Sequence, residues 1–111
     1  MSEGPVTDIT DSQFEENVIE GEGIIIVDFW APWCGPCHTM APSLESFAKA
    51  NPQTARVFKL DVEDNPKTAE RYEIRSVPTV IYFRGGEPIC THKGAMSESA
   101  LQEKLDSLSA P

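Results

Sequence analysis

Two cysteines separated by two residues follow a nearly continuous apolar segment, and this arrangement limits the possible folds more than any other feature. The segment Ile24–Phe29 is rich in β-branched and aromatic residues and is interrupted only by Asp28, which is typical of a strand covered on both faces. Cys34 and Cys37 come next, and a helical pattern follows them to about Ala50. Residues three apart in a helix have Cα atoms about 5 Å apart, within reach of a disulfide. The sequence therefore predicts a cysteine pair that can form and break a disulfide at a strand-to-helix junction.

The position of Cys34 at the start of the predicted helix favours a reactive thiolate. The first turn of a helix has backbone N–H groups without partners, and the helix dipole places positive charge there. Such a site stabilises an anionic sulfur, which is the nucleophilic form of cysteine. Cys37 lies one turn further along, so we expect it to be less exposed than Cys34. These features indicate a redox pair.

Two other interpretations of the cysteines remain open at this point. A permanent structural disulfide would be unusual in a reducing compartment. A zinc site requires four ligands, and Cys34, Cys37, Cys90 and His92 could supply them. However, Cys90 and His92 are two residues apart on a predicted strand, and no regular knuckle spacing is present. We therefore expect no metal site.

The rest of the chain alternates between strand and helix patterns. Thr10 and Gln13 form a capping-box pattern that begins the first helix, and Ser97 or Ser99 is expected to cap the last one. The predicted elements are a short strand over 6–9, a helix to Gly21, strands over 24–29 and 57–62, helices over 35–50 and 65–72, and a strand hairpin over 79–83 and 89–93 before the last helix. This order predicts an α/β fold in a single domain, with a central mixed sheet of four to five strands flanked by four helices.

Composition excludes several classes of function. The chain has 111 residues, of which 40% are hydrophobic, so it suffices for one domain over residues 6–111, and residues 1–5 are expected to form a flexible arm. The net charge is −9, which argues against binding nucleic acid or an anionic membrane surface. No basic and apolar leader is recognisable at residues 1–5, so we expect a cytoplasmic protein, and we expect it to be a monomer.

The run Phe29-Trp30-Ala31-Pro32-Trp33-Cys34-Gly35-Pro36-Cys37 resembles the active-site signature of the thioredoxin family. The resemblance extends over nearly the whole chain, through segments 26–29, 59–62, 64–66, 74–79 and 93–95. It implies the thioredoxin fold and a protein-disulfide oxidoreductase in which Cys34 is the nucleophile and Cys37 is the resolving cysteine. It also implies that Gly35 and Pro36 tune the redox potential towards that of the reducing members.

The resemblance assigns roles to residues for which the local pattern alone indicates nothing special. Asp28 matches the acid that transfers a proton to and from Cys37, although an acid in a strand could also reach solvent. Lys59 matches the lysine that pairs with this acid, although the alternation over 57–62 is equally typical of an exposed side chain. Pro78 matches a cis proline beside the disulfide, whereas its place before a strand alone favours trans. The implied substrate-binding surface comprises Trp33, Val77, Pro78, Gly94 and Ala95.

Two residues, His38 and Cys90, depart from the family pattern. His38 stands where many members carry Lys or Arg; its imidazole either tunes the pKa of the thiols or is an exposed helix residue with little effect. Cys90 is an additional cysteine, interpreted either as an inert strand residue or as a site of intermolecular disulfides or glutathionylation. We assign no role to His92.

The implied partners are thioredoxin reductase and disulfide-containing target proteins. We expect no bound cofactor because no dinucleotide-binding fingerprint is present, so NADPH would be used only indirectly through the reductase. Two alternatives remain: an oxidant or isomerase, and a non-catalytic binding or folding-partner module that uses the same apolar surface.

Overall fold

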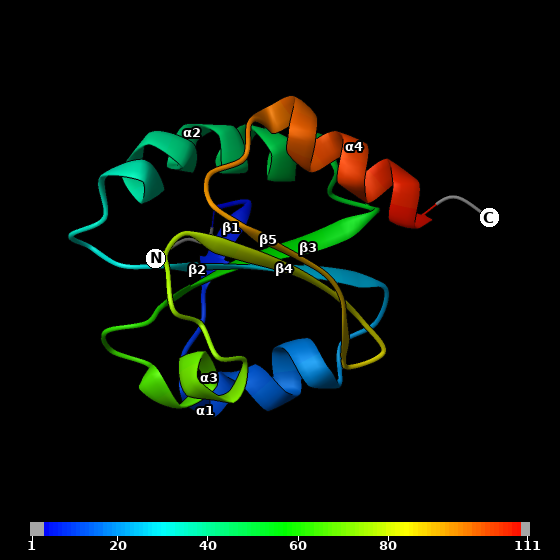
Figure 1. Ribbon diagram of the computed structural model, residues 1–111. Coiled ribbons are helices and arrows are strands. Elements are labelled where there is room, and N and C mark those ends of the chain that lie inside the picture. The colour runs from blue at the N-terminus through cyan, green and yellow to red at the C-terminus, as the bar shows by residue number, and fades with distance from the viewer. Residues whose placement is uncertain (1–3, 110–111) are drawn as a thin grey trace.

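Residues 4–109 are described by a computed structural model, in which a central sheet is covered by helices on both faces (Figure 1). The elements in chain order are β1 (Val6–Asp8), α1 (Asp11–Phe14), the π-helical turn η1 (Glu15–Ile19), β2 (Ile24–Trp30), α2 (Gly35–Ala50), β3 (Ala55–Asp61), α3 (Pro66–Arg71), β4 (Thr79–Arg84), β5 (Glu87–Lys93) and α4 (Glu98–Ser109). The predicted α/β architecture is confirmed.

The sheet has five strands in the order β1-β3-β2-β4-β5. β3 runs parallel to both β1 and β2, whereas β4 runs antiparallel to β2 and to β5, so the sheet is mixed as expected. The apolar strand β2 lies in the centre. Its carboxyl end leads directly to the cysteines, and β3 ends beside it in the same direction. The loops after these two strands therefore meet at one edge of the sheet.

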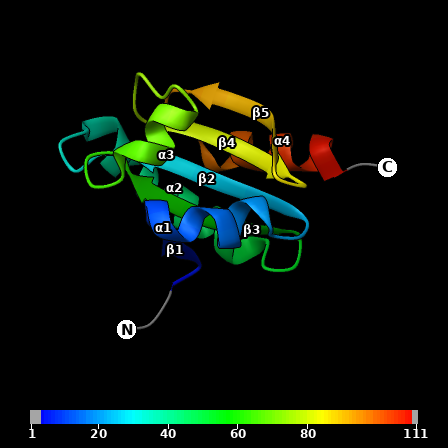
Figure 2. The ribbon, with the colours of Figure 1, turned by 90° about the horizontal axis from the view of Figure 1, so that it is seen from below.

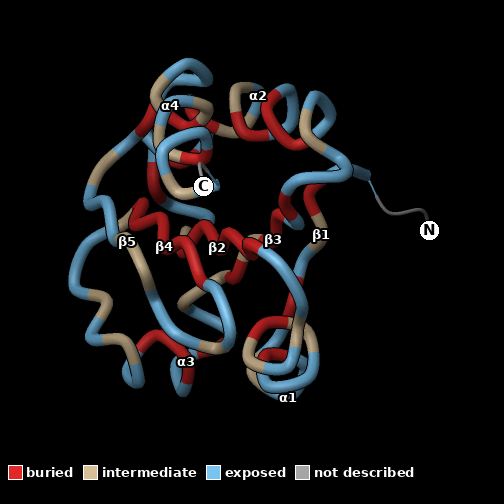
Figure 3. The backbone as a smooth tube through the Cα atoms, turned by 90° about the vertical axis from the view of Figure 1, so that its right-hand side faces the viewer, coloured by how far each residue is buried: buried red, intermediate tan, exposed pale blue. Residues whose placement is uncertain are grey.

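Two hydrophobic cores lie on opposite faces of the sheet. α2 and α4 cover one face, and α1 and α3 cover the other (Figures 1 and 2). Side chains of β2 alternate between them: Ile24 and Ile26 pack in the α2/α4 core, while Ile25 and Val27 pack in the α1/α3 core. Figure 3 shows that buried residues are concentrated in the strands and on the helix sides that face them. This alternation places Asp28 on the α2/α4 face.

Asp11 connects α1 to α3 on the face of the sheet that these two helices cover. Its carboxylate accepts hydrogen bonds from the backbone N–H groups of Lys67 (3.1 Å) and Thr68 (2.8 Å) and from the Thr68 hydroxyl (2.6 Å). It thereby caps the first turn of α3 from another part of the chain. These bonds outweigh the effect of burial, which alone would raise the pKa of Asp11, so that the pKa lies below its ordinary value.

The boundaries of several elements differ from the prediction. The capping box at Thr10 is formed, but the first helix changes to a π-helical turn at Glu15. β3 begins at Ala55 and β5 begins at Glu87, both two residues earlier than the apolar pattern indicates. The reason is that strand pairing extends beyond the clearly apolar runs: Ala55 is aligned with Ile24, and Glu87 with Arg84. Of the expected arm over residues 1–5, the first three residues lie outside the described part of the chain.

Candidate active site

Cys34 and Cys37 form a disulfide at the start of α2, with their Cα atoms 5.3 Å apart. Cys34 is the N-cap residue, and its Sγ accepts a hydrogen bond from the backbone N–H of Cys37 at 3.1 Å. The sulfur thus satisfies one of the donors that the first turn leaves unpaired. The predicted cysteine pair at a strand-to-helix junction is confirmed, and the helix start is suited to stabilise a thiolate at Cys34 after reduction.

The expected difference in exposure between the two cysteines is wrong for this oxidised form. The exposed fraction of Cys34 is 3% and that of Cys37 is 4%. Both pack in one small cluster with Ala31, against which Val62 and Val77 lie. Because a disulfide joins the two sulfurs, neighbouring side chains cover them as one unit.

Asp28 is a buried acid on the side of β2 that faces α2. Its exposed fraction is 3%, and its Oδ1 has no hydrogen-bond partner among the described residues. Burial raises the pKa of Asp28 to about 7, while the charge of Lys59 acts in the opposite direction. A carboxyl group with this pKa exchanges its proton readily near neutral pH, as a general acid or base requires.

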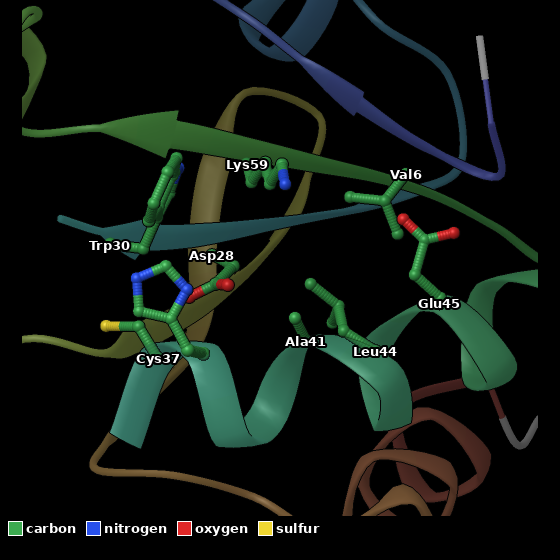
Figure 4. A pocket seen from close by; sticks show the side chains of 9 residues that line it. Val6, Asp28, Trp30, Cys37, Ala41, Leu44, Glu45 and Lys59 are labelled. Atoms are coloured by element: carbon green, nitrogen blue, oxygen red, sulfur yellow. The ribbon is translucent and has the colours of Figure 1, made fainter. Parts of the chain in front are cut away.

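A cavity of about 90 Å³ joins Asp28 to the buried side of the disulfide. Figure 4 shows Asp28 and Lys59 reaching it from the sheet, while Cys37 borders it from α2. Its lining consists of Val6, Asp28, Trp30, Cys37, His38, Ala41, Leu44, Glu45 and Lys59. This volume has room for a few water molecules, and the polar groups around it would hold them.

Lys59 is placed beside Asp28 by strand register. The two residues are aligned across β2 and β3, so their side chains leave the same face of the sheet. They form no direct ion pair: over residues 4–109 such a pair occurs only between Arg71 and Glu15. The Lys59 Nζ lies 5.1 Å from the centre of the Trp30 ring, which indicates a cation–π contact. Lys59 therefore acts on the pKa of Asp28 through space.

The residues of the implied substrate surface lie around the disulfide. Trp33, on the turn before Cys34, has an exposed fraction of 68%. The Val77–Pro78 peptide bond is cis, as the resemblance implies. The backbone N–H of Gly94 donates to the Pro78 carbonyl at 2.8 Å, and Gly94 has a φ of 105°, which favours glycine. Ala95 is exposed next to it.

Sequence reasoning missed two contacts of the turn that carries Trp33. The Trp33 indole N–H donates to Glu63 Oε2 at 3.0 Å, and His38 Nε2 lies 2.7 Å from the Pro32 carbonyl oxygen. The parallel order of β2 and β3 would have indicated that Glu63, two residues after β3, lies near Trp33. No pattern in the sequence indicated the His38 contact.

Cys90 and His92 do not join the cysteine pair. Cys90 is half-buried on β5 against the α2/α4 core, and His92 is exposed on the same strand. No group of three or more His, Cys, Asp or Glu residues within 4–109 is arranged to hold a metal ion. The four residues considered for zinc are therefore not brought together.

The comparison with known proteins agrees with this geometry. The family model described as Thioredoxin matches residues 5–107. The chain is 44% identical over 101 residues to a thioredoxin of Buchnera aphidicola subsp. Acyrthosiphon pisum, covering 91% of this chain and 94% of that protein. It is 45% identical over 101 residues to a thioredoxin of Staphylococcus haemolyticus, covering 91% and 95%. The chain belongs to the thioredoxin family.

Membership of the thioredoxin family, together with the cysteine pair, identifies the activity as protein-disulfide reduction. A non-catalytic binding module is not favoured.

A further similar protein is the chloroplastic M-type thioredoxin of Pisum sativum, which is 42% identical over 98 residues. These residues cover 88% of this chain and 57% of that protein. Among the helices within residues 4–109, none combines the length and the hydrophobicity that a membrane-spanning segment requires.

Proposed function

We propose that this protein reduces disulfides of target proteins through Cys34 as nucleophile, Cys37 as resolving cysteine and Asp28 as proton carrier. The observation that supports this assignment best is the cavity that Asp28 and Cys37 share. Both residues line it, and burial raises the pKa of Asp28 to about 7, which supports proton transfer from the thiol of Cys37 in the second step.

The reaction consists of two exchanges of sulfur partners. In the first, the Cys34 thiolate attacks one sulfur of the target disulfide; a Cys34–target bond forms, the target S–S bond breaks, and the other target sulfur leaves as a thiolate. In the second, Cys37 transfers its proton towards Asp28 and attacks Cys34 Sγ. The mixed disulfide breaks, the second target sulfur leaves, and two electrons have passed to the target. The Cys34–Cys37 disulfide of this structure is the product.

Asp28, Lys59 and the residues between the cysteines adjust these steps. Asp28 accepts the proton of Cys37 through water in the cavity, and Lys59 keeps the pKa of Asp28 from rising further. Gly35 and Pro36 form the first turn of α2 and would tune the redox potential through the stability of the disulfide.

The proposed docking surface for target proteins consists of Trp33, Val77, Pro78, Gly94 and Ala95. Val77 lies just outside the ladder of β4, which begins at Thr79. An extended target segment could therefore pair with its backbone in the manner of an added strand. Because Val77 packs against the cysteine cluster, such a segment would lie beside Cys34.

Each turnover leaves the protein oxidised, so it requires a supply of two electrons. We assign this role to thioredoxin reductase, with NADPH used only by that partner and no cofactor on this chain. A cytoplasmic location would suit the activity, because that compartment is kept reducing. We further propose a monomer with a single domain over residues 6–111.

An insulin-reduction assay with dithiothreitol as electron source tests the proposed activity. The wild-type protein should accelerate reduction strongly, Cys34→Ser should abolish the acceleration, and Cys37→Ser should accumulate a mixed disulfide with the target. A redox titration of the cysteine pair accompanies it. An inactive wild-type protein would overturn the reductase assignment, and an oxidising potential would favour an oxidant or isomerase instead.

A further inference from the structure

The turn that joins β2 to α2 presents both Trp33 and Cys34. The backbone N–H of Cys34 donates to the Ala31 carbonyl at 3.1 Å and closes this turn. Pro32 and Trp33 are its central residues, and both are exposed. The ring of Pro32 fixes its own φ, whereas the backbone of Trp33 has no such restraint, so contacts from outside the turn contribute to its shape.

His38 supplies such a contact from α2. Its Nε2 lies 2.7 Å from the Pro32 carbonyl oxygen, and because a carbonyl only accepts, Nε2 carries the hydrogen. The imidazole also meets the Trp30 ring edge-to-face, with ring centres 6.0 Å apart. The backbone N–H of His38 donates to the Cys34 carbonyl at 3.3 Å. The donor is thus aimed at the turn by both the helix and the neighbouring ring.

Glu63, two residues after β3, supplies a second contact to the turn. Its Oε2 accepts the indole N–H of Trp33 at 3.0 Å, and its own backbone N–H donates to Asp61 Oδ1 at 2.9 Å. The turn is therefore held by one hydrogen bond to each of its central residues, from two elements that are far apart in the sequence.

We propose that His38 is a positioning residue, which holds the Pro32–Trp33 turn in the shape that target proteins recognise. This inference rests on the proposed role of Trp33 in target docking. The restraint acts on recognition more than on folding, since solvent can satisfy the exposed Pro32 carbonyl when His38 is replaced. The thiol chemistry with a small reductant does not require the docking surface and should be largely unaffected.

The contact does not depend on the charge of the imidazole. Nε2 carries a hydrogen both in one neutral tautomer of the imidazole and in the protonated ring, and either form can donate to the Pro32 carbonyl. His38 also borders the cavity with Asp28, Glu45, Cys37 and Lys59. If His38 acted through charge on these groups, its replacement would change the pH profile of the reaction. A restraint by hydrogen bonding changes the rate by the same factor at every pH.

Two uncharged replacements separate the hydrogen bond from the ring and its charge. The amide nitrogen of Gln reaches about as far as Nε2, whereas that of Asn reaches only as far as Nδ1. His38→Gln can therefore keep the donor to Pro32, and His38→Asn cannot. His92→Asn, on the exposed face of β5, is the matched control for the substitution itself.

The variants are compared in insulin reduction from pH 6 to 8 and in direct reduction of their disulfide by dithiothreitol. Loss of one ordinary hydrogen bond corresponds to a factor of about three to ten. We expect His38→Asn to lower kcat/KM for insulin by about this factor at all pH values, through a higher KM, and to leave the dithiothreitol rate nearly unchanged. His38→Gln should recover most of the loss. The ¹⁵N relaxation of Trp33 should show a more mobile backbone amide and indole in His38→Asn only.

The inference is overturned if Gln and Asn behave alike, if the pH profile changes, or if dithiothreitol reduction slows as much as insulin reduction. It is also overturned if Trp33 is no more mobile in His38→Asn than in wild type. A wild-type protein that fails to reduce insulin would refute the proposed function instead, while the relaxation experiment would still test whether His38 restrains the turn.

Discussion

Replacing Asp28 with Asn should stabilise the protein, and the gain should increase with pH. The pKa of this buried carboxyl group is raised from 3.8 to about 7 in the folded protein. The folded state therefore binds more protons than the unfolded state between these values. Stability falls as pH rises through this window, because the carboxylate of the unfolded chain then has to take up a proton on folding.

The magnitude follows from the difference between the two pKa values. Each pKa unit corresponds to about 1.4 kcal/mol, so the raised pKa of Asp28 lowers the free energy of unfolding, relative to its value at low pH, by about 1.5 kcal/mol at pH 5 and about 4 kcal/mol at pH 8. Asn removes this cost but introduces its own buried amide, whose effect does not vary with pH. The free energy of unfolding of Asp28→Asn, measured relative to wild type, should therefore be about 2–3 kcal/mol higher at pH 8 than at pH 5.

Urea unfolding of the oxidised proteins at several pH values measures this difference. Asp106→Asn on α4 is the matched control, since Asp106 is exposed and its side-chain oxygen can still accept the hydrogen bond from Gln102 after substitution. The control should follow the wild-type pH dependence. A difference between Asp28→Asn and wild type that stays constant with pH would refute the argument that burial raises the pKa of Asp28.

Three further outcomes test other parts of the structure. Lys59→Met should raise the pKa of Asp28, because it removes the charge that opposes burial; an unchanged or lower value in a carboxyl titration by NMR would contradict this. Asp11→Ala should lower the free energy of unfolding, measured in urea, by about 1–2 kcal/mol, because it removes the cap of α3. This loss should diminish as the pH falls below 3.8 and through the lower pKa of Asp11 in the folded protein. A neutral effect at pH 7 would show that the cap contributes nothing. Gly86→Ala should destabilise the protein more than Gly85→Ala. Both glycines have a positive φ, at which an alanine would be strained by about 1–2 kcal/mol. Only at Gly86 would the added Cβ also lie 3.0 Å from the carbonyl oxygen of Ile19, the last residue of η1. Equal unfolding midpoints would disprove the difference.

Local patterns were sufficient to predict the order of the elements. The apolar run before Cys34, the helical spacing after it and the hairpin signals all depend on residues that are close in the chain, and the strands and helices form where these patterns lie. The spacing of Cys34 and Cys37 likewise determined that the two could bond. The predicted starts of β3 and β5 were wrong because strand pairing, rather than side-chain polarity, decides where a strand begins.

The sequence by itself thus determined the cysteine pair, the single α/β domain and, through resemblance, the family. The tertiary structure decided the environment of each group. The pKa of Asp28 depends on burial beneath α2 and on Lys59 in another strand, and the shape of the Trp33 turn depends on His38 and Glu63. Proton affinity and loop geometry are set by neighbours in space. Lys59 and Glu63 come from a part of the chain that lies about 30 residues from Asp28 and Trp33, and only the folded sheet brings these segments together.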